Sequence, residues 1–285
     1  MKEYLDMVRH VLEHGVKKTN RTGVPTRSVF SYFYKVDLAK GFPLLTTKKM
    51  YFNSMLHELF WYLSGEEHIK ELRNHTKIWD AWADDEGHLA TAYGRFWRRY
   101  PVPKKGLPGE NWGKKWITKE GGEKTFDQIQ YIIDTLKEIK KNPDTPNLRR
   151  MVVVAWHPAN AAESLLPPCH YTFCFNVLGG KLNCHLTQRS ADIALGVPFN
   201  LACYSLLTLM LAQETGFKAG EFAHTLIDAH IYENHIGGLK EQLEREPKPL
   251  PKIMIAKKPF DELRFEDITL VDYHPDPVIK FDVAV

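Results

Sequence analysis

A β-hairpin signal in the second half of the chain constrains the fold more than any other feature of the sequence. Large apolar residues alternate with smaller or polar ones from Tyr171 to Val177, and the alternation resumes from Leu182 to Leu186. Gly179-Gly180 separates the two runs, and a glycine pair suits the tight two-residue turn that joins antiparallel strands. The pattern therefore predicts a hairpin over 170–188.

Other periodic segments predict both helices and strands. Residues 52–63 have the spacing of a helix that is apolar on most of its circumference, so we expect this helix to be buried. The continuous apolar run at 151–156 is typical of a strand covered on both faces. The remaining expected elements are helices over 3–14 (ended by Gly15), 126–139, 201–215 and 231–244, and strands over 28–36, 252–256 and 278–284.

Helices and strands mix along the chain without an internal repeat, which predicts one α+β domain over 1–285. Within it, residues 101–125 are rich in glycine, proline and lysine, and we expect them to form a variable surface loop. The 38 Lys and Arg residues nearly balance the 35 Asp and Glu residues. This balance argues against a protein devoted to nucleic acid or membrane surfaces.

The apolar segments and the cysteines bear on where the protein works. The longest apolar stretch, 201–212, is shorter than the roughly 20 residues that span a bilayer, and the N-terminus has no apolar signal core. No pair of the four cysteines has the C-x-x-C spacing of a zinc or redox site. We expect a reduced, cytoplasmic protein with no membrane partner.

Cys169 is the first candidate for chemistry. It follows Pro167-Pro168, whose fixed backbone would hold a thiolate at the entrance of a strand. From this segment alone, a buried structural cysteine remains the commoner interpretation.

A second group of residues suits anion binding. Arg189 and Ser190 stand side by side and can offer a fork of N–H donors and a hydroxyl to a phosphate, although an ion pair between Arg189 and Asp192 is the alternative. Arg21 and the pair 149–150 are further basic candidates, each of which is commonly a solvated charge. The Asn200 amide carries both a donor and an acceptor, which matches the edge of a pyrimidine.

Two polar features fall within apolar segments. Asp228 and His230 suggest a metal site, but no third ligand follows at a fixed spacing, so hydrogen bonding to a sugar hydroxyl or core packing is favoured. Glu58 lies on the apolar helix, where burial would raise its pKa and suit proton transfer; pairing with a basic group is the alternative.

Basic and aromatic residues are interleaved over 95–116, a pattern that can bind single-stranded RNA. A solvated basic loop is the simpler interpretation, because the whole chain is nearly neutral.

Taken together, these segments resemble the thymidylate synthase family along nearly the whole chain. The matching motifs are Asn20-Arg21-Thr22-Gly23, His57-Glu58-Leu59-x-Trp61, Ile78-Trp79-Asp80-x-Trp82, Arg149-Arg150, Pro168-Cys169-His170, Gln188-Arg189-Ser190-x-Asp192, Leu195-Gly196-x-Pro198-Phe199-Asn200, Asp228-x-His230-Ile231-Tyr232-x-Asn234-His235 and Ala284-Val285. The resemblance implies an α+β fold in which a mixed sheet, packed by helices, forms a homodimer interface.

The resemblance also implies a reaction. The Cys169 thiolate, favoured by Arg189, would add to C6 of dUMP, and 5,10-methylenetetrahydrofolate would supply a one-carbon group and a hydride to give dTMP. The implied catalytic residues are Cys169, Glu58, Arg189, Asp192, Tyr93 and His170. The implied dUMP ligands are Arg21, Arg149, Arg150, Gln188, Arg189, Ser190, Asp192, Asn200, His230 and Tyr232, with Arg149 and Arg150 coming from the other subunit. The implied folate contacts are Ile78, Trp79, Trp82, Asp192, Gly196, Phe199 and Val285, and no metal is expected.

Pyrimidine nucleotide hydroxymethylases are the nearest alternative within the resemblance, because they share the fold but add water in place of hydride. The chain departs from the usual synthase pattern near the residues assigned to the chemistry, at Ala90, Thr91, Phe96, Cys174 and Ile227. Asn200 argues for uracil, since the cytosine-specific relatives carry Asp there. Trp79 argues for hydride transfer, since an indole would shield the methylene from water.

Overall fold

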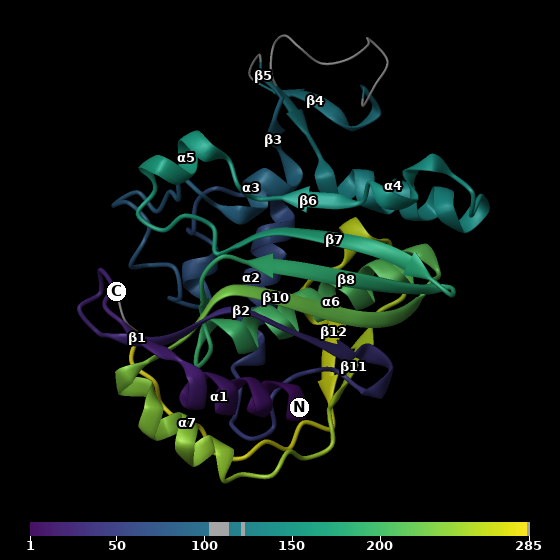
Figure 1. Cartoon of the computed structure of the whole chain (residues 1–285). Helices are drawn as coiled ribbons and strands as arrows, with labels where there is room; N and C mark the ends of the chain where they lie inside the picture. Colours follow the sequence, from purple (N-terminus) through teal and green to yellow (C-terminus); the bar gives the residue numbers. More distant parts are fainter. Residues whose placement is uncertain (103–113, 121–122, 284–285) are drawn as a thin grey trace.

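The computed structural model describes residues 1–102, 114–120 and 123–283. A seven-stranded mixed sheet lies at its centre, in the order β1-β2-β10-β8-β7-β6 with β9 beside β10 (Figure 1). The strands are β1 (Val16–Lys18), β2 (Thr26–Asp37), β6 (Val152–Val154), β7 (His170–Leu178), β8 (Lys181–Gln188), β9 (Ala191–Asp192) and β10 (Lys218–Tyr232). Together with the helices below, this arrangement confirms the expected α+β class.

The predicted hairpin is confirmed. Strands β7 and β8 are antiparallel, with Leu178 paired to Lys181 across the turn. Gly179 and Gly180 have φ values of 58° and 72°. Both values lie in the left-handed region, which glycine adopts more readily than other residues because it has no Cβ.

The long strand β10 is a feature that the sequence did not suggest. It pairs antiparallel with β2 and parallel with β8, so it joins the two halves of the sheet. The helix predicted over 231–244 is wrong at its start, because Ile231 and Tyr232 end β10 and helix α7 begins at Ile236 (Ile236–Leu243). Buried His224 interrupts the apolar alternation of the strand and hid its period of two.

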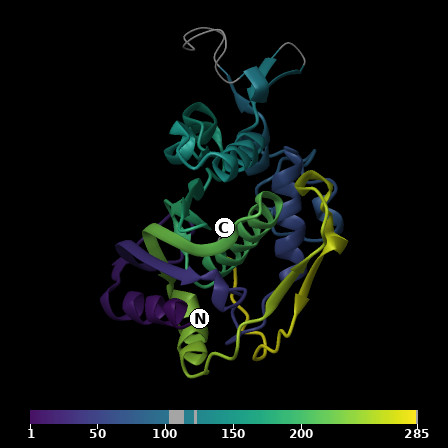
Figure 2. The same ribbon diagram turned by 90° about the vertical axis from the view of Figure 1, so that its right-hand side faces the viewer.

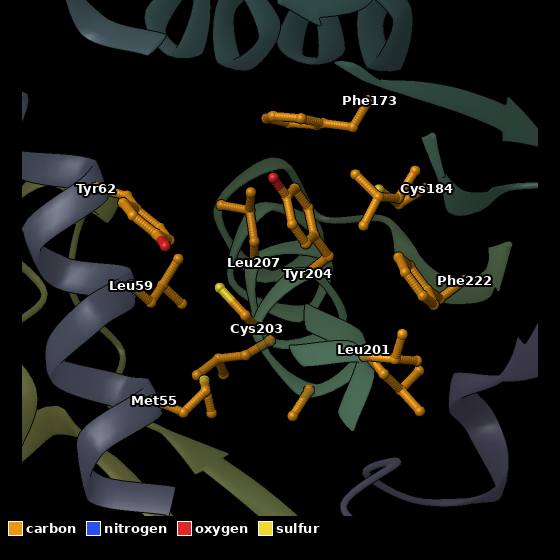
Figure 3. Close-up of a cluster of buried hydrophobic side chains, with 14 of the residues drawn as sticks. Met55, Leu59, Tyr62, Phe173, Cys184, Leu201, Cys203, Tyr204, Leu207 and Phe222 are labelled. Carbon is orange, nitrogen blue, oxygen red and sulfur yellow. The ribbon is translucent and has the colours of Figure 1, made fainter. Parts of the chain in front are cut away.

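Helix α6 (Gly196–Thr215) is the core of the fold. It starts five residues earlier than predicted, because Pro198 falls in its first turn, where a missing N–H costs nothing. Figure 3 shows Cys203 and Leu207 of α6 facing helix α2 (Phe52–Ser64), and Phe173 and Phe222 on the side of the sheet. Among the described residues, α6 is the helix long and apolar enough to span a membrane, but 72% of that stretch is buried inside the protein. It is therefore a core helix.

Three other expectations need correction. Strand β6 is not covered on both faces: it lies at the edge of the sheet, and Val152 is 46% exposed. Residues 278–283 form no strand. The described part of 101–125 is not only a loop, because β3 (Tyr100–Pro101), β4 (Ile117–Glu120) and β5 (Glu123–Phe126) form a small antiparallel sheet.

The remaining elements lie around this core. They are helices α1 (Lys2–His14), α3 (Tyr93–Arg98), α4 (Gln128–Lys141) and α5 (Pro158–Glu163), and strands β11 (Lys252–Ile255) and β12 (Ile268–Val271). Helices α2 and α6 lie on the same side of the large sheet in both views (Figures 1 and 2). The opposite face, which carries the 55% exposed Phe33, has no helix of the described chain over it.

Candidate active site

A cavity of about 660 Å³ opens where β8 and β10 end, β7 begins and α6 starts. Most of the predicted site residues line it, although they come from segments far apart in the sequence. These are Arg21, Glu58, Ile78, Trp79, Trp82, Tyr93, Cys169, His170, Gln188, Arg189, Ser190, Asp192, Gly196, Phe199, Asn200, His230 and Tyr232. The fold thus brings the expected nucleophile, anion-binding and aromatic residues into one place.

Cys169 is held by its backbone and its neighbours. Its N–H donates to the hydroxyl of Tyr93 over 2.7 Å, and its Sγ lies 3.9 Å from Nη2 of Arg189. Arg189 is itself fixed, because Nη2 donates to the carbonyl of Pro167 over 2.7 Å and Nε to that of Pro168 over 3.0 Å. The two prolines therefore orient both the thiol and the cation beside it.

The charge state of Cys169 reflects two opposing effects. Burial raises the pKa of the thiol, whereas Arg189 and Arg21 lower it. Arg189 acts in the direction expected from the sequence, but burial outweighs it and the pKa is raised overall. In the ligand-free site the thiol form of Cys169 is therefore favoured at neutral pH.

Glu58 faces the cavity from α2, and its burial raises its pKa to about 7. Hydrogen bonds from Tyr62 and from Nε1 of Trp79, the latter at 2.8 Å, partly offset the effect of burial. Both partners are neutral donors, and no basic side chain of the described residues forms an ion pair with Glu58, which was the alternative expectation. Near neutral pH this carboxyl exchanges a proton readily, which suits general acid–base work.

His170 forms a wall of the cavity beside Cys169. Its ring stacks on Tyr93 at 3.9 Å between centroids, and its Nδ1 lies 2.6 Å from the hydroxyl of Tyr204. Burial lowers the pKa of His170 to about 3, so the ring stays neutral. It positions its neighbours and does not supply a proton at neutral pH.

The end of β10 carries a charged pair. Asp228 accepts from Nζ of Lys18 at 2.5 Å and lies 3.3 Å from Nδ1 of His230. The hydrogen bond from His230, and then Lys18, holds the pKa of Asp228 well below its usual range. Asp228 and His230 thus engage each other and a lysine, and no group of three or more metal-ligating side chains is found among the described residues.

Three predicted residues are not seen in the cavity. Arg149 and Arg150 are exposed near the end of a 3-10 helix (Pro146–Arg149), and neither lines the cavity. Val285 lies outside the described residues, although Val283 lines the cavity.

Sequence reasoning missed several residues of the site. Lys18, Asn20, Thr22 and Tyr51 line the cavity. The motif at 20–23 offered a signal for Asn20, whose Oδ1 accepts from the backbone N–H of Thr22 over 2.9 Å and so shapes the loop that carries Arg21. No pattern in the sequence pointed to Lys18.

Comparisons with known proteins agree with this geometry. The family described as thymidylate synthase matches residues 2–285. A thymidylate synthase of Haloferax volcanii is 50% identical over 335 aligned residues, which cover 98% of this chain and 95% of that protein. Neither finding favours the hydroxymethylase or the RNA-binding alternative, and most of the basic 95–116 segment lies outside the described residues. The chain belongs to the thymidylate synthase family of methyltransferases.

Proposed function

We propose that this enzyme converts dUMP to dTMP by reductive methylation, with 5,10-methylenetetrahydrofolate as donor of the carbon and the hydride. The observation that carries the proposal is the convergence of a thiol, two arginines, a pyrimidine-reading amide and a carboxyl of pKa about 7 on one cavity. Membership of the family supports the choice of these two substrates.

The nucleotide would enter with its phosphate at Arg21, Arg189 and Ser190, which all line the cavity. This placement would bring C6 of the uracil to Sγ of Cys169, and addition of the thiolate there makes C5 nucleophilic. The thiol must first lose its proton, since burial raises its pKa. His230 and Tyr232, at the end of β10, would hold the ribose hydroxyl.

Glu58 would handle the protons of the reaction. Its Oε1 is fixed by the indole of Trp79, and its pKa of about 7 lets it give or take a proton without a large free-energy cost. The same indole would cover the reacting carbon and exclude water, which favours hydride transfer over hydration. Folate would supply the carbon and the hydride from the side of the cavity formed by Ile78, Trp79, Trp82, Asp192, Gly196 and Phe199, with Val285 as a further contact.

A homodimer would complete the phosphate site. Arg149 and Arg150 are exposed and lie outside the cavity of their own chain. The uncovered face of the large sheet, which carries Phe33, offers a surface for a second copy. Packing of two such faces would let the arginine pair of each subunit reach the phosphate in the other.

The test is incubation of the enzyme with dUMP and methylenetetrahydrofolate, followed by mass analysis of the nucleotide and spectroscopic assay of the folate. We expect dTMP and dihydrofolate in equal amounts. Hydroxymethyl-dUMP without dihydrofolate would contradict the proposal and would identify water as the final reactant.

A further inference from the structure

A continuous chain of hydrogen bonds lies beneath the cavity. Asn200 Nδ2 donates to Oε1 of Gln188 over 3.0 Å, and Nε2 of His224 lies 3.1 Å from the same oxygen. Nδ1 of His224 lies 2.9 Å from the hydroxyl of Tyr34. Tyr34, His224 and Gln188 are all buried, and neither Tyr34 nor His224 lines the cavity.

The sheet register explains why these side chains meet. Tyr34 on β2 is paired directly with His224 on β10. Leu226, two residues further along β10 and therefore on the same face, is paired with Gln188 at the end of β8. The chain of bonds thus crosses three strands on the face that is packed by α6.

The carbonyl of Ser190 determines how the protons along this chain are arranged. A carbonyl oxygen can only accept, so Nε2 of Gln188, 2.9 Å away, must be the donor. Oε1 of Gln188 then faces Asn200 and His224, and both must donate to it. Burial lowers the pKa of His224 far below its usual value, so the neutral ring carries its single proton on Nε2. Its Nδ1 is therefore an acceptor, and the hydroxyl of Tyr34 is the donor.

This order matters because an asparagine amide can read either pyrimidine. Uracil presents a donor at N3 and an acceptor at O4, whereas cytosine presents an acceptor and a donor at these positions. To form hydrogen bonds with cytosine, the Asn200 amide has to flip so that Oδ1 and Nδ2 exchange places. Oδ1 would then face Oε1 of Gln188, and both of these atoms are acceptors. An unsatisfied buried pair of this kind is costly, which is how a site rejects a near-isosteric ligand.

We propose that Tyr34 and His224 are positioning residues that fix the amide of Asn200 through Gln188, and that this makes the site select uracil over cytosine nucleotides. The inference rests on the proposed function, because it takes dUMP as the ligand of Asn200. It extends the set of residues that decide specificity to two side chains that touch no substrate.

The experiment measures equilibrium binding of dUMP and dCMP by calorimetry to the wild-type enzyme and to the Tyr34→Phe and His224→Leu variants. Loss of one buried hydrogen bond in the chain is expected to lower the preference for dUMP over dCMP by about tenfold in each variant. If the two residues had a purely structural role, their replacement would weaken the binding of dUMP and dCMP equally. The ratio of the two dissociation constants would then stay unchanged. Tyr34→Phe removes only a hydroxyl group. This variant alone suffices for the test if His224→Leu does not fold.

Tyr4→Phe is the matched control. Tyr4 is fully buried and its hydroxyl donates to the carbonyl of Ile193 over 2.9 Å, so this variant loses a comparable bond outside the chain and should keep the wild-type ratio. An unchanged ratio in folded Tyr34→Phe, or a wild-type enzyme that binds both nucleotides equally, would overturn the inference. A wild-type enzyme that prefers dUMP yet forms no dTMP would overturn only the proposed reaction.

Discussion

At the scale of single residues, the site depends on groups whose protonation the fold has altered. Cys169 has a raised pKa despite two nearby arginines, and Glu58 titrates near neutrality. Both shifts arise from burial, which disfavours a charge in each case. In the proposed reaction, the Cys169 thiol must therefore lose its proton before it attacks, whereas Glu58 can give or take a proton near neutral pH.

Replacement of Cys169 by Ala should abolish turnover and leave nucleotide binding intact. Without Sγ no bond to C6 forms, so we expect dTMP formation to fall by more than about 1,000-fold. Arg21, Arg189, Ser190 and Asn200 remain, so the dissociation constant for dUMP should change by less than about threefold. Steady-state assays and calorimetry measure the two quantities. Continued turnover in this variant would remove the nucleophile assignment.

Glu58→Gln should change how stability depends on pH. The carboxyl has a pKa of about 7 in the folded protein and an ordinary value of 4.5, so the folded state holds its proton more tightly. The stability due to this group is fully present below pH 4.5 and is lost as the pH rises through 7. Between pH 5 and 8 the wild-type free energy of unfolding should fall by roughly 2–3 kcal/mol relative to that of the variant.

Denaturant titrations of both proteins at several pH values measure this difference. The variant retains the shape of the side chain and one acceptor oxygen for Nε1 of Trp79, and it does not titrate. It therefore separates the effect of titration from the effect of packing. Parallel pH curves for the two proteins would show that Glu58 has an ordinary pKa.

At the scale of elements, local sequence patterns predicted those helices and turns whose formation depends mainly on neighbouring residues. The hairpin at 179–180 and the buried helix α2 follow from turn chemistry and from the helical period. Strand β10 was not predicted, because His224 and Asp228 interrupt the alternation of apolar and polar residues that marks a strand. Both side chains are polar because they form hydrogen bonds with side chains of other strands. The position of the strand around Val152 at the edge of the sheet was not predicted either, because the order of strands in a sheet is not a local property of the sequence.

The candidate site was predicted by a different route, from motifs of the family. Those motifs include the residues that we propose touch the substrates, such as Cys169, Arg189 and Asn200, and these three line the cavity. They gave no sign of Tyr34, whose contribution depends on its register opposite His224. Residues that act through a neighbour are found only when the fold places them together.

The contact between helices α2 and α3 yields a prediction at this scale. A Cβ on Gly94 would lie 2.3 Å from the carbonyl oxygen of Tyr62, so the two backbones touch. Gly94→Ala should therefore cost about 1–3 kcal/mol of stability and lower activity, because it displaces Tyr93 beside Cys169. Thermal unfolding and turnover measure both effects.

Gly237→Ala is the matched control for that variant. Gly237 lies in helix α7, and a Cβ there meets no atom within 4 Å. The change should stabilise the protein by up to about 1 kcal/mol, since alanine favours a helix over glycine. Equal destabilisation by both variants would mean that the close approach of α2 and α3 carries no special cost.

At the scale of the whole molecule, the exposed arginine pair and the uncovered sheet face point to one expectation. A Cys169→Ala subunit retains Arg149 and Arg150, and a subunit with both arginines changed to Ala retains its thiol. If each arginine pair serves the other subunit, every mixed dimer contains one complete site. Random exchange of the two inactive proteins should then restore about a quarter of the wild-type activity per subunit.

The measurement is dTMP formation after the two variants are unfolded together and refolded, with sedimentation to verify the dimer. Each variant treated alone is the control and should stay inactive. Absence of activity in a verified mixed dimer would place the arginine pair in its own subunit's site. Activity of the arginine variant alone would place the pair outside the reaction altogether. Recovery at the expected level would mean that a single chain, whose cavity already holds the thiol, the amide and the carboxyl, still needs a second copy to complete the binding of one phosphate.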